Sequence, residues 1–141
     1  MAVVETIDLA EVAPAVIVRD RSDIATAVGF GWPVTLLSPP GFALYCGAPW
    51  WMALLDQANF RGFSLLDCAD APGRALEALY LGLPGIVLAA EPVATERVTA
   101  VAVQYGALMF NRPPPALDLS LPSAKSRLRD WLRGDVRGNL G

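Results

Sequence analysis

A chain of 141 residues is long enough to bury the core of one compact domain, and we assign residues 1–122 to an α/β domain. Hydrophobic residues make up 54% of the sequence and charged residues only 18%, so little charge remains to cover the surface. We therefore expect an exposed apolar patch that a second copy of the chain covers, and the expected assembly is a homodimer.

Charge and cysteine content narrow the class of protein. Acidic side chains outnumber basic ones before residue 123 and the net charge is −3, which disfavours nucleic acid as a partner. Proline, glycine or a charge interrupts each apolar run before it reaches the length of a membrane span, and residues 1–11 do not resemble a signal peptide. The isolated Cys46 and Cys68 lack the spacing of a metal site and favour a reduced, cytoplasmic protein. We expect no metal, no cofactor and no membrane partner.

The N-terminal part of the chain predicts one strand and one helix. Residues 1–14 alternate only weakly and are expected to form an edge strand or an arm on a neighbouring subunit. Residues 15–19 are β-branched and predict the first clear strand. Asp20 or Ser22 can then cap a helix of about residues 23–30, which glycines and a proline end.

A second strand is predicted at residues 34–38, where two prolines end it. The helix that follows, about residues 49–58, begins with a proline and is apolar almost all round. Such a helix is buried on more than one side, so core packing and a subunit interface are both open interpretations. The residues that carry the interface hypothesis are Trp50, Trp51 and Met52.

The middle of the sheet is predicted at residues 63–67, a buried strand that stops on polar residues and turns directly into a helix. Asp70 has the side chain of a helix cap, Pro72 fits the first turn, and Gly82 ends the helix. The inward stripe of this helix is expected to comprise Leu76, Leu79 and Tyr80.

Residues 85–90 form a continuous apolar run, as expected of a buried parallel strand. A longer helix opens at Pro92 and ends before Gly106, and the fifth strand covers residues 107–111. The inward residues of this helix are expected to be Val93, Val98, Val101, Ala102 and Tyr105.

Three consecutive prolines then predict an extended linker at residues 113–121. Residues 123–141 are expected to form an amphipathic helix, capped by Ser123 and packed on the same domain, and a frayed tail. Strands that alternate with helices predict right-handed crossovers and a three-layer α/β/α sandwich. We expect a mostly parallel five-stranded sheet of the flavodoxin or Rossmann type.

The residue types present exclude several chemistries. The sequence has no histidine, which removes the most common general base and the imidazole metal ligand. Its single lysine, Lys125, lies in the tail, so neither a Schiff base nor a phosphate-loop lysine is expected. The glycines of Gly29-Phe30-Gly31 end a helix instead of opening one, unlike a dinucleotide-binding loop. We therefore name no catalytic residue.

Ligands of open parallel sheets bind beyond the carboxyl ends of the strands, and polar residues stand at those ends here. Each also has a structural interpretation: Asp70 as a helix cap, Asp67 as a turn former or ion-pair partner, and Cys68 as a buried apolar side chain. The candidate ligand-binding residues are Asp20, Ser38, Asp67, Cys68, Asp70, Glu91, Asn111 and Arg112.

The pattern at the strand ends resembles that of phosphoacceptor receiver domains over about residues 15–115. Asp20 and Asp67 follow the first strand and end the third, and Arg112 precedes a proline as the family's lysine does. The sequence departs from the family in the missing lysine and in two alanines where the fourth strand should end on a hydroxyl. The resemblance implies an α/β sandwich and, as a remote option, magnesium-dependent phosphorylation of Asp67.

The sequence thus predicts two alternative functions. The first is a non-catalytic, oligomeric binding or interaction module whose assembly depends on the aromatic helix. The alternative is a small-ligand-binding protein or an enzyme that uses a carboxylate cluster of Asp20, Asp67 and Asp70. No residue pattern identifies a substrate or a partner.

Overall fold

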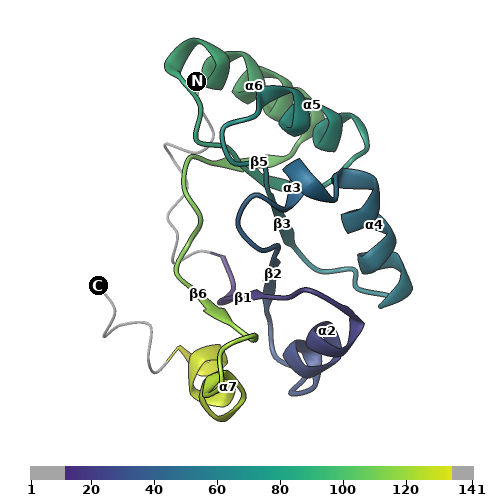
Figure 1. The fold of residues 1–141 in the computed structure, drawn as a ribbon, viewed down its shortest axis with the longest axis vertical. Helices are drawn as coiled ribbons and strands as arrows, with labels where there is room; N and C mark the ends of the chain where they lie inside the picture. The colour runs from purple at the N-terminus through teal and green to yellow at the C-terminus, as the bar shows by residue number, and fades with distance from the viewer. Residues whose placement is uncertain (1–11, 135–141) are drawn as a thin grey trace.

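The computed structural model describes residues 12–134. Residues 1–11 and 135–141 lie outside this part, and with them most of the expected N-terminal strand or arm and the expected frayed tail. A parallel β-sheet flanked by helices forms the centre of the molecule, so the predicted α/β class is confirmed (Figure 1). The sheet has six strands, one more than expected.

The strands are short and the helices between them are of unequal length. The strands are β1 (Ala15–Ile17), β2 (Thr35–Leu37), β3 (Ser64–Asp67), β4 (Gly85–Val87), β5 (Leu108–Phe110) and β6 (Ala116–Asp118). The helices are α2 (Arg21–Val28), α3 (Phe42–Tyr45), α4 (Ala48–Gln57), α5 (Pro72–Tyr80), α6 (Pro92–Tyr105) and α7 (Ala124–Arg133).

The order of the strands determines where the helices lie. The sheet runs β5-β4-β3-β2-β1-β6, and every pairing is parallel. Strands β1 to β5 are therefore added one after another in a single direction. Right-handed crossovers that keep stepping in one direction leave their helices on one face, and Figure 1 shows α2, α4, α5 and α6 along the same side of the sheet.

Side-chain alternation along the strands divides the core into two clusters. The larger cluster combines strand residues such as Leu36 and Ile86 with buried residues of the helices, among them Trp51. The smaller cluster lies on the other face, around Leu65 and Phe110, and no helix of the described chain contributes a side chain to it. The helices therefore cover the two faces of the sheet unequally.

Local sequence signals explain most helix ends. Asp20 caps α2, because its carboxylate accepts a hydrogen bond of 2.8 Å from the backbone N–H of Asp23. Pro72 and Pro92 lie in the first turns of α5 and α6, and Gly106 ends α6 in a left-handed conformation, as predicted. Between residues 12 and 134, none of the helices has both the length and the apolar character that crossing a lipid bilayer requires.

Several predicted elements need correction. The expected linker contains β6, which pairs with the outer edge of β1. A short helix, α3, lies in the loop after β2, where no element was expected. Tyr80, Val93 and Tyr105 are exposed instead of inward, because α5 and α6 turn their smaller residues toward the sheet. The rings of Tyr80 and Tyr105 contact each other on the outer surface, with centroids 5.7 Å apart.

The last helix is tied to the start of the sheet. Trp131 of α7 is buried, and its indole N–H donates a hydrogen bond of 2.8 Å to the backbone carbonyl of Ala15 in β1. Ser123 stands at the N-terminus of α7 but makes no side-chain capping bond, contrary to the prediction. α7 is held by its apolar face instead, through Leu128 and Leu132.

Candidate functional site

Asp67 and Ser38 meet at the carboxyl end of the sheet, as expected for the ends of neighbouring strands. The backbone N–H of Asp67 donates a hydrogen bond of 2.8 Å to Ser38 Oγ, and that hydroxyl donates to the carbonyl of Pro39 at 3.3 Å. Both side chains are buried. The Ser38 hydroxyl thus joins the end of β2 to the end of β3.

The Asp67 carboxylate shapes the loop after β3. Its Oδ1 accepts a hydrogen bond of 2.8 Å from the backbone N–H of Ala69. Ala69 has a φ of 50°, in the left-handed region that alanine adopts only at a cost. The carboxylate therefore supports a strained turn, which agrees with the interpretation of Asp67 as a turn former.

Cys68 faces the opposite side of the sheet from Asp67. Its side chain is completely buried in the larger cluster, as predicted. Burial, together with the smaller effect of the neighbouring charges of Asp67 and Glu77, raises the pKa of the thiol to about 12. The thiol stays protonated near neutral pH, so Cys68 is a core side chain and not a nucleophile.

The other candidate residues are spread along the exposed edge. Asp20 is engaged as the cap of α2. Asp70 is not a cap: Ala71 occupies the N-cap position and α5 begins at Pro72, directly after the turn that Asp67 stabilises. Glu91 precedes α6 without a side-chain capping bond. The remaining exposed candidates are Asn111 and Arg112.

The polar pair that the sequence analysis missed lies between β1 and β6. Arg19 follows β1, and its guanidinium makes two hydrogen bonds to the carboxylate of Asp118 at the end of β6, one of them 3.2 Å long. This pair raises the pKa of Arg19 and lowers the pKa of Asp118 to about 2, mainly through the hydrogen bond between them. No local pattern relates two residues so far apart in the chain.

The arrangement gives these polar groups structural roles. Asp20 caps a helix, Asp67 holds a turn, and Asp118 binds Arg19. In the part of the chain that the structure describes, no three His, Cys, Asp or Glu side chains gather as metal ligands. Ligand binding by the strand-end residues and phosphorylation of Asp67 stay predictions.

The two tryptophans of α4 separate into different environments. Trp51 is fully buried and contacts the ring of Phe42 edge to face, with centroids 5.7 Å apart. Trp50 is 52% exposed, and Met52 is half-buried against the core. Core packing is therefore correct for Trp51, whereas Trp50 stands on the surface.

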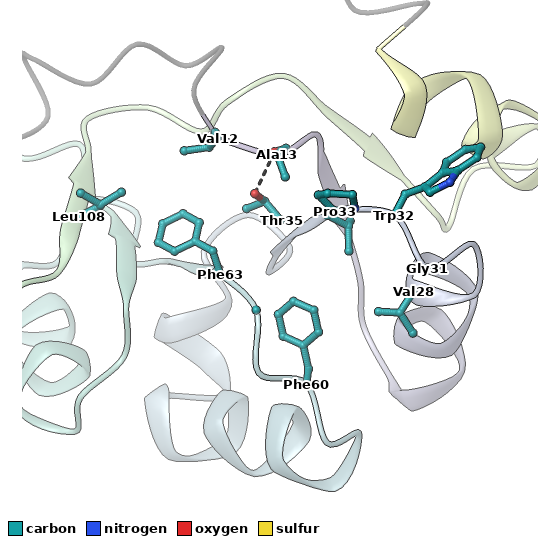
Figure 2. A pocket seen from close by; sticks show the side chains of 12 residues that line it. Val12, Ala13, Val28, Gly31, Trp32, Pro33, Thr35, Phe60, Phe63 and Leu108 are labelled. Carbon is teal, nitrogen blue, oxygen red and sulfur yellow. Dashed lines mark hydrogen bonds between the residues drawn. The ribbon is translucent and has the colours of Figure 1, made fainter.

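An apolar pocket that was not predicted lies at the opposite end of the sheet, where the strands begin (Figure 2). Loop residues before β1, β2 and β3 form most of its wall, and Phe60 and Phe63 contribute aromatic rings. The sequence does hold a signal, because aromatic residues stand beside Gly31 and Gly62 in two loops that precede strands. The rule that ligands bind beyond the carboxyl ends of parallel strands does not cover the amino ends, where this pocket lies.

Comparison of the sequence with protein-family models finds no matching family, and comparisons with curated proteins and with solved structures find no match. The function must therefore be argued from the surfaces and contacts of this chain.

Proposed function

We propose that the protein is a non-catalytic interaction module that forms a homodimer through an exposed apolar surface on α3 and α4. This α3–α4 surface consists of Leu44, Tyr45 and Trp50, which are 46%, 65% and 52% exposed. These three large side chains lie close together in the chain and expose apolar area to water. Covering that area with a partner would be favourable. Their exposure is the observation that carries the proposal.

Contacts with buried aromatic side chains hold the α3–α4 surface in place. The ring of Tyr45 contacts the ring of Phe42 edge to face, with centroids 5.5 Å apart, and Phe42 in turn contacts the buried Trp51. Pro49 stiffens the first turn of α4 directly before Trp50. Aromatic side chains that are fixed before binding lose little entropy on association, and Trp and Tyr dominate the binding energy of many interfaces.

The contacts at the carboxyl end of the sheet support the non-catalytic part of the proposal. Asp67, Ser38 and Arg19 are each engaged in hydrogen bonds within the chain. Cys46 is exposed and Cys68 is buried, and neither forms a disulfide, as is usual in a reducing compartment. We accordingly place the module in the cytoplasm.

The test replaces Tyr45 and Trp50 together by glutamate and measures the native mass over a range of protein concentrations. We expect the wild-type chain to be a dimer and the double variant a monomer, because two carboxylates would have to be buried in the interface. Both side chains are exposed, so the fold should persist, which circular dichroism checks.

The matched control carries glutamate at Tyr80 and Tyr105, an exposed aromatic pair on α5 and α6. It should remain a dimer. A wild-type monomer at all concentrations would refute the homodimer. A dimer that only the control variant disrupts would show that the partner binds α5 and α6 instead.

A further inference from the structure

The pocket at the amino end of the sheet has a volume of about 690 Å³. Small-molecule sites have volumes of about 300–1,000 Å³ and apolar linings with a few polar groups. The pocket is lined by Val12, Ala13, Val28, Gly31, Trp32, Pro33, Val34, Thr35, Phe60, Gly62, Phe63 and Leu108. No ionisable side chain appears in this lining, although Arg61 stands in the loop before β3, between Phe60 and Gly62.

The single hydroxyl in the lining is already engaged. Thr35 Oγ donates a hydrogen bond of 2.8 Å to the backbone carbonyl of Ala13 across the pocket wall (Figure 2). A charged ligand would find no counter-ion among the lining side chains, and an extended peptide would find few partners for its backbone amides. The chemistry of the wall therefore favours an uncharged ligand without many hydrogen-bonding groups.

Rings from separate loops face the same space. Figure 2 shows the rings of Phe60, Phe63 and Pro33 around the open centre of the pocket, whereas the ring of Trp32 extends away from them. Phe60 and Phe63 are only half-buried. Flat apolar ligands contact aromatic rings well, by stacking or by edge-to-face contact.

Gly62 allows this arrangement of the wall. A Cβ added at this position would lie 2.7 Å from the ring of Phe60. Any other residue would therefore push the ring of Phe60 out of its present position. The loop before β3 thus contains both the Phe60 ring and Gly62, the residue that leaves room for this ring.

We propose that this pocket binds an uncharged, aromatic small molecule between Phe60, Phe63 and Pro33. The proposal is independent of the homodimer, because the α3–α4 surface shares no residue with the pocket. Each can fail without the other.

The experiment titrates the full chain with N-phenyl-1-naphthylamine, an uncharged aromatic dye that fluoresces in apolar surroundings. We expect saturable binding of one dye per chain. Val28→Arg should weaken binding about tenfold or more, because it places a charge at the rim of an apolar site. Val93→Arg is the matched control, since Val93 is an exposed helical valine that does not line the pocket, and it should bind like the wild type.

A second measurement does not depend on any variant. In two-dimensional amide spectra of the wild-type chain, the dye should shift the N–H signals of Gly31 and Gly62. Shifts centred on Tyr45 and Trp50 would overturn the proposal, as would the absence of saturable binding or equal affinities of the two arginine variants. Binding that appears only after Val3, Val4, Ile7 and Leu9 are replaced by serine would also overturn it, because a segment of the chain itself would then compete for the pocket.

Discussion

Asp67 stands where a catalytic carboxylate could stand, but its observed contact is a hydrogen bond to the backbone. It ends the central strand, as in receiver domains, but its Oδ1 accepts the N–H of Ala69 within a left-handed turn. The sequence reveals that the acid stands at the end of a strand. It does not reveal the conformation of Ala69, because alanine is an unusual residue for a positive φ. The error at Asp70 lies in the same segment, since Ala71 takes the N-cap position of α5 directly after that turn.

We predict that Asp67→Ala lowers the free energy of unfolding by about 1–3 kcal/mol, because the partly buried N–H of Ala69 loses its acceptor. Asp67→Asn retains an acceptor oxygen and should cost less. Urea unfolding of the two variants measures the difference. If asparagine destabilised the chain as much as alanine, the charge of Asp67 and not its hydrogen bond would be the stabilising feature.

At the scale of elements, helices and strands with a local signal were predicted well and those defined by distant contacts were not. The strands before α2 and α6 were found because apolar runs end at capping residues or prolines. β6 was missed because it is three residues long, follows three prolines and acquires its strand geometry only by pairing with β1. The pocket was missed for the same reason, because its wall is assembled from loops that are distant in sequence.

The ion pair that joins β6 to β1 should weaken at acid pH. Arg19 lowers the pKa of Asp118 to about 2, so the ion pair stabilises the fold above the ordinary aspartate pKa of about 3.9 and is lost as the pH falls toward 2. Both side chains are partly exposed, so we expect Asp118→Asn to cost only about 0.2–1 kcal/mol at pH 6. Urea unfolding should show that this cost shrinks between pH 4 and 2. A cost of Asp118→Asn that is the same at every pH would contradict the prediction. The control is Glu96→Gln, which changes an exposed carboxylate on α6.

At the scale of the whole molecule, the two cysteines differ in their exposure to solvent, because one lies on the surface and the other in the core. The predicted burial of Cys68 is confirmed, whereas no prediction was made for the burial of Cys46. Cys46 is exposed and lies between Tyr45 and Trp50 in the chain, whereas Cys68 is in the core. The neighbouring residues do not distinguish the two exposures, because Cys46 stands between Tyr45 and Gly47 and Cys68 between Asp67 and Ala69, one small and one larger neighbour in each case.

We predict that iodoacetamide at pH 8 modifies Cys46 alone in the folded chain and both cysteines after unfolding. Burial keeps the Cys68 thiol protonated and out of reach. Intact-mass measurement counts the adducts. If the α3–α4 surface forms the dimer, the rate at Cys46 should also fall as the protein concentration rises, and rapid modification of Cys68 in the folded chain would contradict the structure.

The position of β6 beside β1 also has a consequence for the order of folding. Strands β1 to β5 can pair with their neighbours as soon as each crossover is made, so these contacts close short loops. The outer edge of β1 pairs with residues 116–118 instead. Among the described strands, this one leaves the ribosome last. Until then the growing chain presents an unpaired strand edge, the kind of surface on which nascent chains aggregate. The C-terminal segment of β6 and α7 thus covers the outer edge of β1, and any pause in synthesis before this segment prolongs the exposure of that edge.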